Sequence, residues 1–205
     1  MVHNLLNEMG VSNVITDPVD GYLTRLEDVI RAISREQVWS VVNVLMEAWR
    51  GKKHIFLLGN GGSAATASHM ANDLNKFTIT TGKPRFKAIT LCDNVPLMTA
   101  WGNDTAYENI FVEQLLNFVE AGDVVIGISA SGNSLNVLKA LSVAHQLCAK
   151  TIGFTGDQGG RLKDIADYCV FIPSGHIGQQ EDGHMILDHV IVTTLKQLIE
   201  NEEQP

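Results

Sequence analysis

Two matched segments of apolar run, small-residue loop and helix constrain the fold of this chain most strongly. Residues 54–58 and 124–128 each predict a buried strand that ends in such a loop. The loops are Gly59-Asn60-Gly61-Gly62-Ser63 and Ser129-Ala130-Ser131-Gly132-Asn133-Ser134. Glycines let a backbone pass close to a ligand, and a helix N-terminus directs free N–H groups at an anion. The pair predicts a site for a phosphorylated ligand, and the second loop, with three serines, is the better phosphate cradle.

The rest of the chain continues this alternation of strands and helices. Further strands are expected at 87–91, 151–155 and 168–172, and helices near 63–76, 95–100, 104–120, 134–148 and 182–200, with a short helix after a Gly-rich turn at 156–160. Such alternation predicts an α/β fold with a central parallel sheet covered on both faces. Ligands bind such sheets outside the carboxyl ends of the strands, where the strand order switches. Both small-residue loops lie at such ends.

Residues 18–50 predict two helices with a break at Ser34. Ser34 is the expected N-cap of the second helix, and Gln37 is expected to complete a capping box. The apolar faces of these helices would pack either on the sheet or on a second subunit. We therefore expect a helical extension over residues 1–50 and one domain over residues 51–205.

Net charge, cysteine content and hydropathy argue against several classes of function. The net charge of -8 argues against nonspecific nucleic-acid binding, although a local group of N–H donors still suits a small anion. The three cysteines, Cys92, Cys148 and Cys169, form no CxxC pair, so reduced thiols in a cytoplasm are expected. Residues 1–17 show no signal-peptide pattern, and no apolar stretch is long enough to span a membrane, so no membrane partner is expected.

His69 and Asp73 lie four residues apart on the predicted helix after the first loop. This spacing places both side chains on one helix face, where they can share a metal ion or act as a base and its orienting partner. The alternative is a solvent-facing pair with a purely local contact.

The last helix begins with a second cluster of titratable residues. Glu181 and Asp182 suit a helix N-terminus by the macrodipole alone. His184 and His189 are five residues apart, about 140° around a helix, so one is expected in a site and the other in packing. His189 has apolar neighbours, which predicts that it lies on a buried wall.

Asp104 follows a turn-prone stretch. It is expected either as a helix N-cap or as a site residue.

Taken together, these motifs resemble the sugar isomerase (SIS) domain, and more closely the phosphoheptose isomerase family. The resemblance spans nearly the whole chain. Its most specific parts are the first loop with His69 downstream, Gly102-Asn103-Asp104, the serine loop, Thr155-Gly156 with Gly159-Gly160, and the acidic start of the last helix. It implies a flavodoxin-like three-layer α/β sandwich that is usually a homotetramer with active sites between subunits. It also implies conversion of sedoheptulose 7-phosphate to D-glycero-D-manno-heptose 7-phosphate, for lipopolysaccharide, capsule or related glycans.

The resemblance further implies one zinc ion per subunit, held by His69, Asp73, Glu181 and His189. Asp73 stands where the family has Glu, and Glu181 where it has Gln. An alignment with one inserted residue would put Gln180 at the Gln position instead. Ala130 stands where the family often has Thr, which removes one hydroxyl from the phosphate loop.

The same resemblance suggests a role for each site residue. Asp73 and His189 would be the acid/base pair, and Asp104 would help to orient the substrate. Substrate contacts are expected from Asn60, Gly61, Gly62, Ser63, Asn103, Asp104, Ser129, Ala130, Ser131, Ser134 and Glu181. Within that set, the three serines of the second loop would hold the 7-phosphate, and the first loop would hold sugar hydroxyls or the carbonyl end.

Two other functions compete with this reading. One is a non-catalytic SIS protein that binds a protein partner or another sugar phosphate. Such a protein is expected to lack the histidines of the cluster, whereas this chain has both His69 and His189. The other is a regulatory SIS domain fused to a DNA-binding domain, for which this acidic chain has no room.

Overall fold

The fold is built on a five-stranded parallel sheet. The computed structural model describes residues 17–202. The prediction that residues 1–17 contain no signal peptide therefore concerns a segment that lies almost entirely outside the described part. The strands are β1 (His54–Gly59), β2 (Lys87–Thr90), β3 (Val124–Ser129), β4 (Lys150–Gly156) and β5 (Tyr168–Ile172). Their order is β2-β1-β3-β4-β5, with every neighbouring pair parallel. This is the flavodoxin-like order, and it confirms the fold expected from the sequence.

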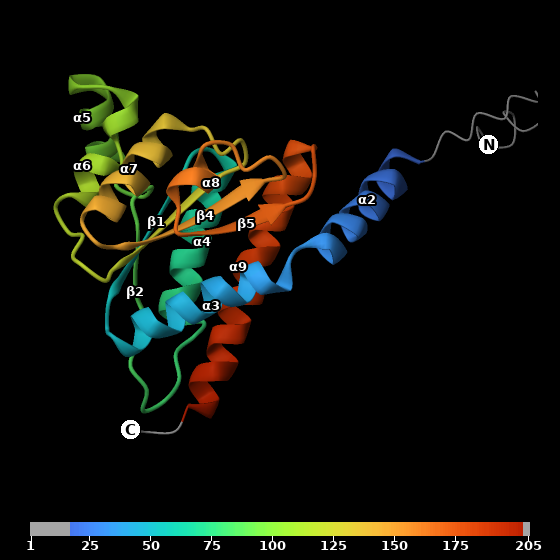
Figure 1. Ribbon diagram of the computed structural model, residues 1–205, viewed down its shortest axis with the longest axis horizontal. Helices are drawn as coiled ribbons and strands as arrows, with labels where there is room; N and C mark the ends of the chain where they lie inside the picture. Colours follow the sequence, from blue (N-terminus) through green and yellow to red (C-terminus); the bar gives the residue numbers. More distant parts are fainter. Residues whose placement is uncertain (1–16, 203–205) are drawn as a thin grey trace, which may run out of the picture.

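Helices cover both faces of the sheet because side chains of each strand alternate between two apolar cores. In β1, Ile55 and Leu57 join one core, while Phe56 and Leu58 join the other. The first core is closed by α3 (Arg35–Arg50), α4 (Gly62–Lys76) and α9 (Ile177–Asn201). The second is closed by α5 (Val95–Asp104), α6 (Val112–Leu115), α7 (Leu135–Gln146) and α8 (Leu162–Ile165). The two helical layers are visible on either side of the strands in Figure 1.

The two N-terminal helices behave differently. In α3, Val41, Val42 and Leu45 are fully buried in the same core as the sheet, so this helix packs within the chain. In contrast, α2 (Pro18–Ala32) buries only Val29 and extends away from the sandwich (Figure 1). The division at residue 50 and the contact of this extension with a second subunit both stay predictions.

The break between these helices is partly as expected. The side chain of Ser34 accepts a hydrogen bond from the N–H of Gln37 at 3.3 Å, so Ser34 is the N-cap. The expected capping box is wrong in its second half. The side-chain oxygen of Gln37 accepts from the N–H of Phe171 in β5, which ties α3 to the sheet instead.

The helix expected over 104–120 is wrong. Asp104 is the last residue of α5, so it does not act as a helix N-cap, and a 3-10 turn (Tyr107–Asn109) and the short α6 follow. The hydroxyl of Thr105 donates to the carbonyl of Trp101 and accepts from Asn109. Such local side-chain bonds compete with a continuous helix.

The last helix is longer than expected. It begins at Ile177 rather than near residue 182, so Gln179 and Gln180 lie in its first turn.

Over residues 17–202, no helix combines the length and apolar character that crossing a membrane requires.

Candidate functional site

The two small-residue loops lie side by side at the switch in strand order. Because β1 pairs directly with β3, with Gly59 opposite Ile128, both loops leave the same edge of the sheet together. They line a pocket of about 200 Å³. Its lining residues are Asn60, Ser63, Ile128, Ser129, Ala130, Ser131, Ser134, Ile177 and Glu181. The structure therefore brings together seven of the residues that the sequence predicts to contact substrate.

The serine loop presents hydroxyl and N–H groups to this pocket. The hydroxyl oxygens of Ser129 and Ser134 lie 3.1 Å apart, and the hydroxyl of Ser131 accepts from the N–H of Asn133. Ser134 directly precedes α7, and within the described chain its side chain makes no capping bond to that helix. The N–H of Val137 donates to Asn136 Oδ1, which leaves the N–H groups of Leu135 and Asn136 at the start of α7 to bind an anion.

The Gly-rich turn after β4 braces the serine loop. The carbonyl of Gly132 accepts from the N–H of Leu162, and the side chain of Asn133 accepts from the N–H of Arg161. Gly132 has a φ of 63°, and a Cβ there would lie 2.1 Å from the carbonyl oxygen of Gly159. This turn therefore fixes the shape of the loop.

Asn60 is oriented by two residues that the sequence analysis missed. Its side-chain amide exchanges hydrogen bonds of 2.9 and 2.8 Å with the amide of Asn136, and Tyr107 donates its hydroxyl to Asn60 Oδ1 at 3.0 Å. Asn136 is 2% exposed in the first turn of α7. An asparagine two residues after a glycine- and serine-rich loop, at the start of an apolar helix, is the sequence signal that could have identified Asn136.

The packing of α4 against α9 creates a second feature, a histidine cluster. The Nε2 atoms of His69 and His189 lie 3.2 Å apart, and His69 Nε2 lies 3.5 Å from Asp73 Oδ2 and 4.0 Å from Asp188 Oδ2. One ligand atom from each of the four residues lies within 4.8 Å of the other three. Two imidazoles and two carboxylates are a donor set that suits zinc or a similar divalent ion.

Burial of the two C-terminal histidines is the reverse of what their neighbours in sequence suggest. His189 is exposed, so the predicted buried wall is wrong at this position. His184 is fully buried and stacks on Phe154 with ring centroids 6.4 Å apart. Burial lowers the pKa of His184 to about 4, so its ring is neutral near pH 7. The structure thus places His189 in the histidine cluster and His184 in packing, and a functional role for His189 stays a prediction.

Glu181 lies apart from the histidine cluster. Its carboxylate faces the start of α4, where a Cβ on Gly62 would lie 2.5 Å from Glu181 Oε1. Gln180, the residue of the alternative alignment, donates to the carbonyl of Ser174 at 2.5 Å. Among the described residues, Glu181 does not belong to the group of four that could hold a metal ion.

Asp188 takes part in that group although the sequence analysis gave it no role. It is fully buried, and both carboxylate oxygens lack a hydrogen-bond partner among residues 17–202. Burial, followed by the charge of Asp73, raises the pKa of Asp188 to about 7. A carboxylate in an apolar stretch of helix, one turn after His184, is the signal that was available.

Asn103 and Asp104 lie at the exposed end of α5, where Asn103 donates to Asp104 Oδ1 at 2.8 Å. In the single chain, neither lines the serine-loop pocket or belongs to the histidine cluster. Their substrate roles stay predictions.

Comparison with known proteins places these features in one family. The model of the SIS domain family matches residues 21–156. The phosphoheptose isomerase of Clostridium acetobutylicum is 38% identical over 76% of this chain and 79% of its own length. That of Geotalea daltonii is 36% identical over 87% and 94%. The solved phosphoheptose isomerase of Neisseria gonorrhoeae superposes with a TM-score of 0.81 at 27% identity, over 87% of this chain and 97% of the other.

Proposed function

The chain belongs to the SIS-domain phosphoheptose isomerase family, and we propose that it converts sedoheptulose 7-phosphate to D-glycero-D-manno-heptose 7-phosphate. This is an aldose–ketose isomerisation of a phosphosugar. The observation that carries the proposal is that the same two helices connect the anion pocket and the histidine cluster. Ser63 and His69 both lie on α4, and Glu181 and His189 both lie on α9.

The spacing of these two features suits a seven-carbon substrate. Six residues separate Ser63 from His69, which is about 9 Å along a helix. The six carbon–carbon bonds of an open-chain heptose, about 1.5 Å each, zigzag over roughly 8 Å. Because Ser63 lines the same pocket as Ser129, Ser131 and Ser134, a phosphate bound in that pocket would leave the carbonyl end of the sugar near the histidines.

Asp73 and His189 are the proposed acid/base pair. One group removes a proton from C1, the C–H electron pair forms the C1=C2 bond of an enediol, and the carbonyl oxygen at C2 takes up a proton. Collapse of the enediol then returns a proton to C2 while the O1 hydroxyl gives up its proton, which leaves the carbonyl at C1. These transfers need one group that accepts a proton while another donates one, and an imidazole beside a carboxylate can fill both roles. Asp104 would assist by orienting the substrate.

A bound zinc ion would be held by His69, Asp73 and His189 together with a fourth acidic ligand. Because a zinc-bound carboxylate or imidazole is a poorer base, whichever of Asp73 and His189 accepts the proton would leave the ion when substrate binds. The buried carboxylate of Asp188, which has no donor within the described residues, supports a cation at this place. When bound, the ion would polarise the sugar carbonyl as a Lewis acid.

Turnover of sedoheptulose 7-phosphate by the purified protein is the direct test. We expect the purified protein to form the aldose 7-phosphate. This activity should be lost after chelation and should return when zinc is added. Sedoheptulose without its phosphate should react far more slowly, because the serine loop then contributes nothing to binding. Absence of turnover by folded protein in the presence of zinc would contradict the proposal and favour a non-catalytic SIS protein.

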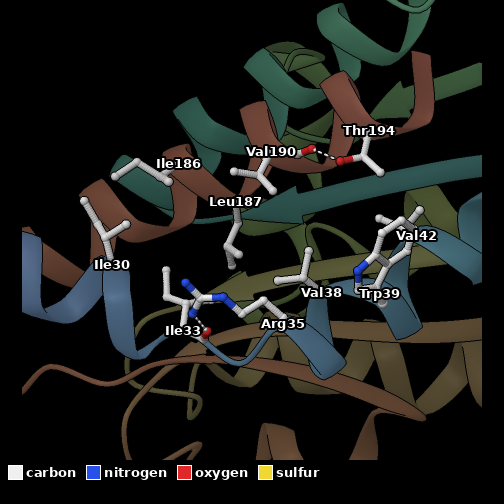
Figure 2. A pocket seen from close by; sticks show the side chains of 10 residues that line it. All are labelled: Ile30, Ile33, Arg35, Val38, Trp39, Val42, Ile186, Leu187, Val190 and Thr194. Carbon is white, nitrogen blue, oxygen red and sulfur yellow. Dashed lines mark hydrogen bonds between the residues drawn. The ribbon is translucent and has the colours of Figure 1, made fainter. Parts of the chain in front are cut away.

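We further propose that the chain assembles as a homotetramer through the surface around α2. We also propose that it works in the cytoplasm, where the free thiols of Cys92, Cys148 and Cys169 would stay reduced. An apolar pocket of about 240 Å³ lies between α2, α3 and α9 (Figure 2). It is lined by Ile30, Ile33, Arg35, Val38, Trp39, Val42, Ile186, Leu187, Val190 and Thr194. The side chains of Val19 and Leu23 on α2 are also more than half exposed. Exposure of apolar side chains to water leaves a helix without the packing that normally stabilises it.

Changing Trp39 to Asp tests this assembly. Trp39 is 49% exposed in the single chain, so a charge there should cost the fold little while it disrupts an apolar interface. We expect light scattering to give a smaller mass for this variant than for the parent protein. A matched change at Tyr107, which is 63% exposed on the opposite side of the sandwich, should leave the mass unchanged. Equal masses for the parent and the Trp39 variant would contradict the proposed interface.

A further inference from the structure

The histidine cluster brings two carboxylates, those of Asp73 and Asp188, to the same imidazole. Asp188 is fully buried, and within residues 17–202 neither of its carboxylate oxygens has a hydrogen-bond donor. His69 Nε2 lies 4.0 Å from Asp188 Oδ2, beyond hydrogen-bond distance, and is closer to Asp73, at 3.5 Å. An isolated buried carboxylate is strongly unfavourable unless a counter-charge meets it. A divalent cation supplies that charge.

Position along α9 separates Asp188 from Glu181. The two residues are seven apart, which is about two helical turns and about 10 Å along the helix axis. Asp188 Oδ2 faces His69, whereas the Glu181 carboxylate lies against Gly62 beside the serine-loop pocket. A single ion bound to His69 and His189 therefore has Asp188 within reach, and Glu181 belongs to the other feature.

We propose that Asp188, rather than Glu181, is the fourth ligand of a divalent cation held by His69, Asp73 and His189, and that Glu181 contacts the sugar. The inference rests on the proposed isomerase site and changes which residue completes it. It also explains why the fold keeps a carboxylate at full burial between Leu187 and the exposed His189.

Metal binding by matched amide variants tests the assignment. The metal-free parent protein, Asp188→Asn and Glu181→Gln are titrated with zinc by calorimetry, and with Co²⁺ while visible absorption is recorded. Each variant replaces a carboxylate by an amide of the same shape. We expect Asp188→Asn to weaken zinc binding at least tenfold and to change the Co²⁺ spectrum. Glu181→Gln should bind zinc within about threefold of the parent and raise the KM for substrate.

Thermal unfolding gives a second readout that a misfolded variant would not reproduce. In metal-free protein, Asp188→Asn removes a buried charge, so its Tm should equal or exceed that of the parent. Zinc at one fixed concentration should then raise the Tm of the parent and of Glu181→Gln more than that of Asp188→Asn, because weaker binding gives less stabilisation. Asp188→Leu, which fills a similar volume without polar atoms, should behave like Asp188→Asn and serves if the amide fails to fold.

Three outcomes would overturn the inference: zinc affinity lost in Glu181→Gln but kept in Asp188→Asn, equal affinity in all proteins, or no divalent ion bound by the parent. Turnover by a parent protein that binds no metal would contradict this inference alone. The expected metal pattern without turnover of sedoheptulose 7-phosphate would contradict the proposed function and leave the ligand assignment standing.

Discussion

Replacing His189 by Gln is expected to lower kcat for sedoheptulose 7-phosphate by about 10³-fold, within the range typical for loss of a general acid or base. Glutamine preserves the approximate size of the side chain but does not exchange protons near neutral pH. Because His189 is exposed on α9, the change should leave the fold and its unfolding transition nearly unaltered. The measurement is steady-state turnover together with exchange of the C1 and C2 protons with deuterated water.

His145→Gln is the matched control for this prediction. His145 is also exposed and lies 3.1 Å from the carboxylate of Asp167, on the helix α7 that covers the opposite face of the sheet. Its variant should retain the parent rate. A loss of less than threefold in His189→Gln, or continued proton exchange at the parent rate, would exclude His189 from the acid/base pair.

Changing Gly132 to Ala is expected to destabilise the protein by about 2–4 kcal/mol and to raise the inhibition constant of inorganic phosphate. The new Cβ would meet backbone atoms of Gly159 and Gly160, at 2.1 Å for the nearest, and these cannot rotate away as a side chain could. The left-handed backbone at Gly132 adds a further penalty for any residue with a Cβ. Urea unfolding and inhibition by phosphate are the two measurements.

Gly61→Ala separates the two causes of lost stability, which are steric contact of the new Cβ and strain in the backbone conformation. Gly61 has a comparable φ of 55°, but a Cβ there would meet nothing within 4 Å. Its ψ of -122° lies outside the left-handed α region, so we expect Gly61→Ala to cost about 1–3 kcal/mol from the backbone conformation alone, less than Gly132→Ala. Equal losses at the two positions would show that contact with the turn after β4 does not hold the serine loop in place.

The sheet and its paired loops could be predicted from the sequence because the signals are local. An apolar run followed by glycines and serines marks a strand and its carboxyl end, and the alternation with helices implies parallel strands. All five strands were found within one or two residues of their observed bounds. The segment after Asp104 was mispredicted because side-chain hydrogen bonds of Thr105 and Asn109 outweigh its apolar periodicity.

Helical spacing also predicted that His69 and Asp73 share a face, since an i, i+4 pair is set by the helix itself. It did not predict which face of α9 meets α4. For that reason His189 was expected on a buried wall, while the structure exposes His189 and buries His184 and Asp188.

The sequence by itself determined the order of the elements along the chain, the two loops at the carboxyl ends of their strands, and the residue types able to bind a phosphate. Only the tertiary structure decided that Asn136 and Tyr107 orient Asn60, and that Asp188 joins the histidine cluster while Glu181 lines the pocket. The reason is physical. Propensity and periodicity act over a few neighbouring residues, whereas these contacts join residues from 47 to 120 positions apart and form only when helices pack.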